Sequence, residues 1–94
     1  MTFAGMHMGM EIELTIQAER DLEDLPVTMF DRYEKVLDRL EKYPEVSGIK
    51  WLTGDWRGHA RIRFGDYRLI FHMEAQQQRI VVDRIAHRKN VYLE

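Results

Sequence analysis

Seven of the nine basic residues in the second half of the chain are arginines, and three of these are spaced so that one surface can carry them. Arg61 and Arg63 are two residues apart, and Arg68 follows after a Gly65-Asp66 pair that is typical of a tight turn. A guanidinium is always charged, and its donors form a fixed fork that matches phosphate oxygens. The spacing therefore indicates a site for an anionic, phosphate-bearing partner; the alternative is an ordinary solvated strand face.

Charge is unevenly distributed along the chain, with an acidic N-terminal half and a basic C-terminal half. Residues 1–46 hold five Lys and Arg against eleven Asp and Glu, whereas residues 47–94 hold nine against five. The formal net charge of −2 and the pI of about 6.1 conceal this division. Such an asymmetry suggests an anionic partner for the basic half.

Length and composition limit the class of protein. The chain has 94 residues, of which 45% are hydrophobic and 32% charged, so it can form one folded domain and is not a disordered or collagen-like sequence. It has no apolar run near the roughly 20 residues that a bilayer requires, no secretory leader and no cysteine. We expect a cytoplasmic protein in which residues 1–10 are a disordered extension and residues 11–94 form the domain.

The N-terminal half predicts one strand and two helices. The run EIELTIQ over residues 11–17 alternates strictly and predicts a half-buried strand. Residues 18–25 have the spacing of a short amphipathic helix, and Asp24 precedes Pro26 as a cap for the next helix, which should end near Tyr43. The apolar stripe of that second helix comprises Val27, Phe30, Tyr33, Val36, Leu37 and Leu40.

The C-terminal half predicts a loop over residues 45–58 and then three strands at residues 59–64, 67–74 and 79–86. A helical hairpin must bury its stripe against one side of a sheet. We therefore expect an α+β fold of two layers, with the helices on one face of a mostly antiparallel four-stranded sheet.

Strand alternation then gives the arginines a common side. If the intervening apolar residues point at the helices, Arg61 and Arg63 point away from them, and Arg68 joins from the adjacent strand. Arg88 and Tyr92, after the last strand, can reach the same edge. Glu74 is the acidic residue expected to offset this charge. The following strand adds Asp83, expected to pair with one of the arginines.

A metal site is not expected, because the four histidines, His7, His59, His72 and His87, show no two-ligand spacing with a carboxylate on one helix. Trp51 and Trp56 can stack on bases, but a tryptophan on a loop over a small core is more often a packing lid.

The runs ARIRFGDYRLIF and IVVDRIAHRKNVY, together with AERDLEDLP, LEKYPEV and WLTGDWRG, resemble the RelE/ParE toxin superfamily of type II toxin–antitoxin systems. The similarity covers about residues 11–92. The resemblance implies a RelE-like ribosome-dependent endoribonuclease that cleaves messenger RNA and inhibits translation. It also implies that a cognate antitoxin, the ribosome and mRNA are the partners, with no cofactor, metal or membrane involved.

The resemblance also assigns the catalytic residues. Arg61 and Arg63 occupy two basic positions on one strand, where lysine is also common, and Arg68 matches the arginine of the family's YR pair. Arg88 and Tyr92 match a basic residue and a tyrosine near the terminus, and His87 matches a terminal histidine that some members use as acid or base. Arginine stays protonated at neutral pH and is a poor base, so Tyr92 or His87 would move the proton.

Two alternatives of the same fold remain open. The first is a ParE-like inhibitor of DNA gyrase without nuclease activity, in which the basic surface binds a protein. The second is an interaction module without toxicity.

Overall fold

The computed structural model describes residues 9–91 of the chain, so Tyr92 and the first eight residues lie outside the described part. Its elements in chain order are β1 (Glu11–Leu14), α1 (Ile16–Glu23), η2 (Val27–Met29), α2 (Phe30–Leu40), β2 (Lys50–Trp51), η3 (Gly54–Trp56), β3 (Ala60–Phe64), β4 (Tyr67–Glu74), η4 (Ala75–Gln77) and β5 (Arg79–His87). Within residues 9–91, no helix has both the length and the apolar character needed to cross a membrane.

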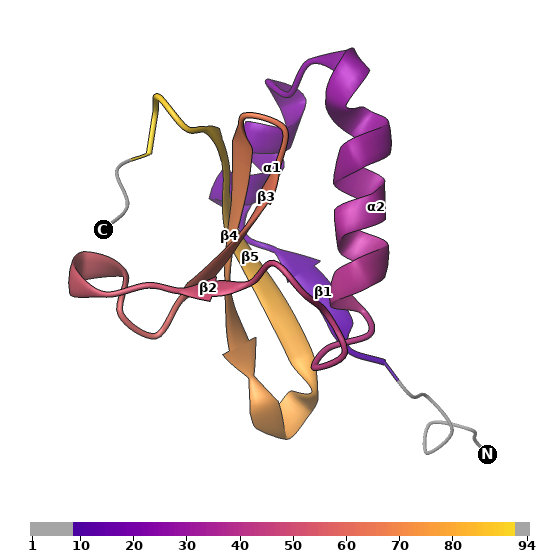
Figure 1. Ribbon diagram of the computed structural model, residues 1–94, viewed down its shortest axis with the longest axis vertical. Helices are drawn as coiled ribbons and strands as arrows, with labels where there is room; N and C mark the ends of the chain where they lie inside the picture. Colours follow the sequence, from indigo (N-terminus) through magenta and orange to yellow (C-terminus); the bar gives the residue numbers. More distant parts are fainter. Residues whose placement is uncertain (1–8, 92–94) are drawn as a thin grey trace.

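The strands form one mixed sheet in the order β1-β5-β4-β3-β2 (Figure 1). β1 runs parallel to β5, and the remaining pairs are antiparallel. The predicted α+β class with a helical hairpin and a three-stranded meander is confirmed. The sheet has five strands rather than four, because residues 50–51, predicted as loop, pair with β3 at the edge.

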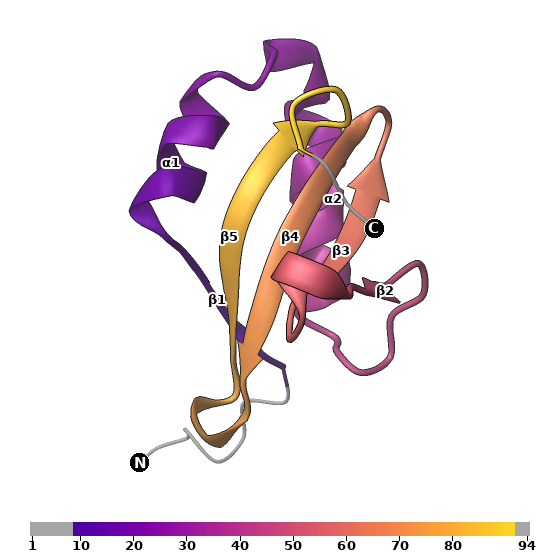
Figure 2. The same cartoon turned by 90° about the vertical axis from the view of Figure 1, so that its left-hand side faces the viewer.

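One core lies between the helices and one side of the sheet. Tyr33, Val36 and Leu40 of α2 are buried there, as the helical spacing predicts. They pack with alternate residues of the central strands, of which Ile62 and Phe71 are almost fully buried. Figure 2 shows α2 behind the sheet and the opposite side of the sheet toward the viewer.

The first strand ends earlier than the alternation of EIELTIQ predicts. β1 stops at Leu14, and the Thr15 hydroxyl accepts a hydrogen bond of 3.0 Å from the Ala18 amide, which caps α1. A threonine at this position satisfies an otherwise unpaired helix amide. Ile16, which the alternation would place on the same face as Ile12 and Leu14, is therefore 70% exposed at the start of the helix.

The second helix is shorter than predicted. Residues 27–29 form a single 3-10 turn, so Val27 is 78% exposed and Phe30 39% exposed, and neither belongs to the buried stripe. Asp24 ends α1 as its C-cap instead of starting the next helix, and no side-chain cap bond is made at η2 or α2.

Helix α1 covers the part of β5 that β1 does not reach. β1 pairs with residues 79–82 only, so the Ile85 amide has no strand partner on that edge. The Asp21 carboxylate accepts a bond of 2.9 Å from this amide and one of 2.7 Å from Arg84 Nε. Burial works against ionisation of Asp21, but the bonds from Arg84, Ile85 and Gln17 prevail and lower its pKa below the ordinary value.

The described chain is already part of the fold before β1 begins. Met10, which the sequence leaves in the extension, packs against the core, and its amide donates a 3.0 Å hydrogen bond to the Glu41 carbonyl at the end of α2.

Candidate functional site

Four cations lie on the side of the sheet that faces away from α2, and we call them the basic face: Lys50, Arg61, Arg63 and Arg68. Lys50 lies directly opposite Arg61, and Arg63 lies directly opposite Arg68. Residues opposite each other on neighbouring strands point to the same side of a sheet. Because Ala60, Ile62 and Phe64, which alternate with the arginines on β3, are buried in the core, the four cations point away from it.

The basic face concentrates like charges without neutralising them. Among residues 9–91, none of the four makes an ion pair with a carboxylate. Partial burial together with the charges of Arg63 and Arg68 lowers the pKa of Arg61. Like charges directly opposite each other on a sheet are destabilising by about 0.2–1 kcal/mol. An anion bound across the strands would relieve this cost, which is the physical reason to regard the basic face as a binding surface.

The edge of this surface is hollowed. A depression of about 460 Å³ lies between α2, β2 and β3, and it is lined by Arg39, Gly48, Ile49, Lys50, Arg61, Ile62 and Arg63. Lys50 was missed as a candidate from the sequence, because a two-residue strand gives no periodicity that would assign its side. A basic residue nine positions before the strand predicted at residues 59–64 was the available signal.

Two of the remaining residues predicted for the site, Arg88 and His87, are not part of the basic face. Arg88 is exposed after β5, where its amide donates to the Asp66 carbonyl and its Nε lies 3.8 Å from Asp66 Oδ1. His87 lies opposite Tyr67, with the two rings edge to face at 5.2 Å, and lines a pocket with Asp21 of α1. This is the helix side of the sheet, away from Arg61, Arg63 and Arg68. Tyr92 lies outside the described residues.

Two histidines and a carboxylate adjoin the basic face. Asp83 Oδ2 lies 2.6 Å from His72 Nδ1 and 3.4 Å from His59 Nε2. The expected pairing of Asp83 with an arginine is therefore wrong. Glu74 likewise does not offset the basic face, because its Oε1 accepts a 3.0 Å hydrogen bond from Arg79 Nη1.

The two tryptophans differ in their surroundings. Trp56 is half-buried and packs edge to face against His59, with ring centroids 5.2 Å apart, as a lid would. Trp51 at the sheet edge is 49% exposed, which leaves its ring accessible for stacking.

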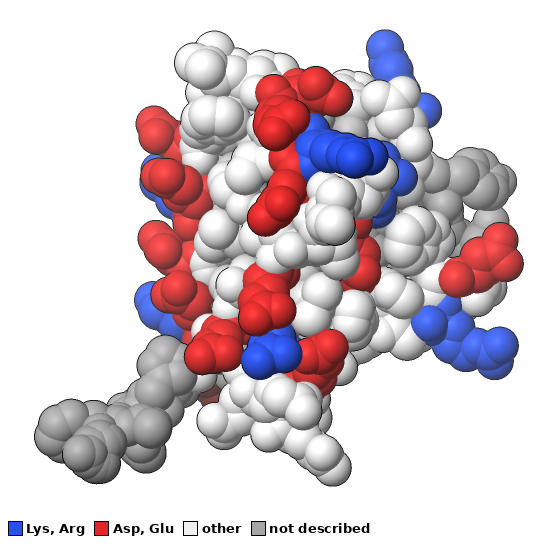
Figure 3. All heavy atoms as spheres, turned by 180° about the vertical axis from the view of Figure 1, so that it is seen from behind, with Lys and Arg blue, Asp and Glu red and all other residues white. Residues whose placement is uncertain are grey.

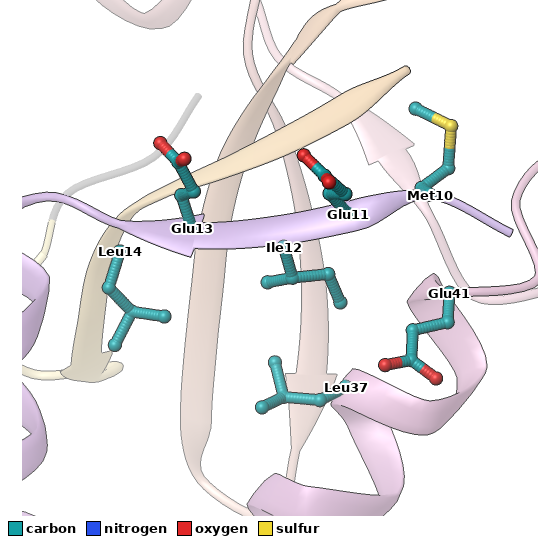
Figure 4. Close-up of a pocket in the computed structure, with 7 residues that line it drawn as sticks. All are labelled: Met10, Glu11, Ile12, Glu13, Leu14, Leu37 and Glu41. Carbon is teal, nitrogen blue, oxygen red and sulfur yellow. The ribbon is translucent and has the colours of Figure 1, made fainter. Parts of the chain in front are cut away.

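A second surface, between β1 and α2, has the opposite charge. A groove of about 560 Å³ is lined by Met10, Glu11, Ile12, Glu13, Leu14, Leu37 and Glu41. Figure 4 shows Ile12 and Leu14 pointing toward Leu37, whereas Glu11 and Glu13 point to the other side of β1. Seen from behind, acidic side chains gather along α2 and over α1 and β1 (Figure 3).

Comparison with known proteins gives one family. The model of the ParE toxin of the type II toxin–antitoxin system parDE matches residues 12–92. No curated protein matches the chain in sequence.

Solved structures share the fold over nearly their whole length. The RelBE2 toxin–antitoxin complex from Mycobacterium tuberculosis contains a chain that is 25% identical, with a TM-score of 0.74 over 84% of this chain and 98% of that one. A chain of the archaeal RelE–RelB complex from Pyrococcus horikoshii is 25% identical, with a TM-score of 0.67 over 89% of this chain and 100% of that one. A YoeB/ParE toxin from Agrobacterium tumefaciens is 19% identical, with a TM-score of 0.71 over 83% of this chain and 98% of that one.

Proposed function

The chain belongs to the ParE toxin family of type II toxin–antitoxin systems, and from that premise we propose that it is a RelE-like endoribonuclease that cleaves messenger RNA on the ribosome. The observation that carries the proposal is the basic face, in which Lys50, Arg61, Arg63 and Arg68 share one open side of the sheet. A polynucleotide supplies the repeated negative charge that such a surface binds. A ribosomal target implies a cytoplasmic location.

The reaction that fits this surface needs no external nucleophile. A ribose 2′-oxygen attacks the adjacent phosphorus, its proton passes to a base, and the bond from phosphorus to the 5′-oxygen breaks as that oxygen is protonated. The products are a 2′,3′-cyclic phosphate and a 5′-hydroxyl. The pentacoordinate state carries extra negative charge, which guanidinium groups held in place before the reaction stabilise.

Proton transfer is assigned less directly. Arg88 and Tyr92 follow β5 on the chain, and their proposed roles rest on the family resemblance alone. His87 points to the helix side of the sheet, so a role in proton transfer would require the substrate to pass around the end of β5. Of the two candidates for acid or base, the placement of His87 therefore favours Tyr92.

The test is to induce the protein in cells and map transcript ends. Cleavage within codons is expected, and it should weaken for Arg61→Ala and Arg68→Ala but not for Lys35→Ala, an exposed lysine on α2 that lies outside the basic face. Cleavage that is equally strong in both arginine variants would contradict the assignment of the basic face.

A second function, inhibition of DNA gyrase without nuclease activity, is favoured by the matching family model, which describes ParE toxins. In that case the basic face binds a protein partner. Intact transcripts together with DNA damage after induction would support it. Growth without arrest in an antitoxin-free strain would support the third reading, an interaction module that is not toxic.

The partner common to the first two readings is a cognate antitoxin, and we propose the groove between β1 and α2 as its seat. The matched RelE structures are complexes with antitoxins. Ile12, Leu14 and Leu37 provide an apolar floor and Glu41 an acidic rim, so an antitoxin segment with apolar and basic residues is expected. Binding of the cognate antitoxin should weaken about tenfold for Glu41→Lys, equivalent to about 1.4 kcal/mol. Glu34→Lys, a charge reversal on α2 outside the groove, should leave it unchanged. Equal affinities for the two variants would place the antitoxin elsewhere.

A further inference from the structure

Three side chains that no single segment of the sequence places together converge beside the basic face. His59 immediately precedes β3, His72 lies on β4 and Asp83 on β5. One donor atom from each side chain lies within 4.8 Å of the other two. All three are half-buried, with side chains 28%, 31% and 20% exposed, so the donor atoms are fixed by the sheet but open to solvent on one side.

An irregularity in β5 turns Asp83 toward the histidines. Ile70 pairs with Arg84 and Phe71 pairs with Val82, which leaves Asp83 as an extra residue without a strand partner. Bulges of this kind redirect a side chain and are frequent next to functional sites. The Asp83 carboxylate thereby reaches His72 and His59, although the three residues lie on different strands or strand ends.

Of the two remaining ring nitrogens, one has a hydrogen-bond acceptor and the other lies near a carboxylate. His59 Nδ1 lies 3.4 Å from the Arg57 carbonyl oxygen. His72 Nε2 lies 4.0 Å from Glu74 Oε2. Histidines that bind metals generally donate the second ring N–H to a carbonyl or a carboxylate, which directs the lone pair of the other nitrogen to the metal. Here this leaves His59 Nε2 and His72 Nδ1 directed at the same carboxylate oxygen.

We infer that His59, His72 and Asp83 form a binding site for a divalent transition-metal ion, with Zn²⁺ the best match. Two imidazoles and one carboxylate are a ligand set that suits zinc, with a fourth position left for water or an anion. Bonds of about 2.1 Å to a tetrahedral ion place neighbouring donor atoms about 3.4 Å apart. The separation of His59 Nε2 and Asp83 Oδ2 is 3.4 Å. The His72 contact of 2.6 Å must open by less than about 1 Å. Rotation of two half-buried side chains accommodates that change.

A simple hydrogen-bonded pair explains less of this arrangement. The contact between His72 and Asp83 alone would satisfy the carboxylate, and it does not require His59 to present Nε2 to the same oxygen. Nor does it require the outward Nδ1 of His59 to face the Arg57 carbonyl. The site is independent of the nuclease proposal, because it requires neither RNA nor toxicity.

The test is direct binding to the purified full-length protein, using Zn²⁺ in calorimetry and Co²⁺ in visible spectroscopy. One saturable site and the intense bands of tetrahedral cobalt are expected. Affinity should fall at least about tenfold, or about 1.4 kcal/mol, in each of His59→Gln, His72→Gln and Asp83→Asn. Because these side chains lie outside the core, circular dichroism should show that all three variants fold.

Two further histidines serve as matched controls. His87→Gln changes a histidine on the helix side of the sheet, and His7→Gln changes one in the N-terminal segment beside several methionines. Neither should alter the affinity or the cobalt spectrum. The proposal is overturned if the wild type shows no saturable binding of Zn²⁺, or if binding survives in the three site variants and is lost in a control.

Discussion

The directly opposed Arg63 and Arg68 give the sharpest physical test of the basic face. Replacing exposed Arg63 with Gln removes one charge while retaining most of the side chain. Like charges opposite each other on a sheet cost about 0.2–1 kcal/mol, so the variant should be more stable than the wild type by about that amount. For a domain of this size the gain corresponds to a rise in Tm of about 1–8 °C. Under the proposed nuclease function, the same change should also weaken RNA cleavage, because it would remove a contact proposed for the phosphate.

The salt dependence separates repulsion from other causes. Chemical denaturation should be measured for Arg63→Gln and for Arg57→Gln, an exposed arginine outside the basic face. The gain should be largest at low ionic strength and should shrink as salt is added, since the screening length is about 10 Å at 0.1 M. An unchanged or lower stability at all salt concentrations, or the same gain for Arg57→Gln, would refute the idea that the basic face stores repulsion.

Three further predictions concern the elements that hold this surface. Asp21→Asn should destabilise the fold by about 1–3 kcal/mol, because it weakens the bonds that satisfy the edge of β5. The pKa of Asp21 is lower in the folded protein than in the unfolded chain, so ionised Asp21 contributes fully to the free energy of unfolding above pH about 3.9. That contribution is lost as the pH falls through the pKa of the folded state. The free energy of unfolding should therefore decrease less on acidification in Asp21→Asn than in the wild type. Gly65→Ala should cost about 1–2 kcal/mol from the positive φ of 58°, and the added carbon should add little to this, because the atom 2.8 Å away is the terminal methyl of Met29, the end of a flexible side chain. Thr15→Ala should lower the thermal stability by about 1 kcal/mol through loss of the α1 cap, and Thr15→Ser should restore it.

The meander was predictable because its information is local. The sequences of β3 and β4 show period-two alternation directly, β5 is apolar enough to indicate a central strand, and the Gly65 turn marks the boundary between β3 and β4. Prediction from alternation failed at the end of β1, where a strand pattern overlaps a helix-capping residue. Alternation continues past Leu14, but Thr15 caps a helix, and the capping bond determines where the strand ends. β2 could not be predicted because two residues form no pattern.

The common side of the arginines could be predicted from the sequence, whereas the cluster of His59, His72 and Asp83 could not. Placing Arg61 and Arg63 on one side needs only the pleat of a single strand. His59, His72 and Asp83 come together only through the register of three strands and the extra residue in β5. Neither feature can be predicted from the spacing of residues along the sequence. A search for metal ligands on one helix therefore could not find a cluster that the sheet assembles.

The fold places the acidic and the basic half of the sequence on two different surfaces of the protein. The acidic N-terminal half provides β1, α1 and α2, and the basic C-terminal half provides β2 to β5. Because β1 joins the sheet beside β5, it lies at the edge opposite β2, and the acidic groove against α2 is separated from the basic face by the sheet itself. Under the proposed function, a basic antitoxin segment and an anionic nucleic acid would thus be attracted to different sides of the sheet. It follows that an antitoxin confined to the groove would leave the basic face open, so neutralisation of toxicity requires the antitoxin either to extend around the sheet edge or to act through α2.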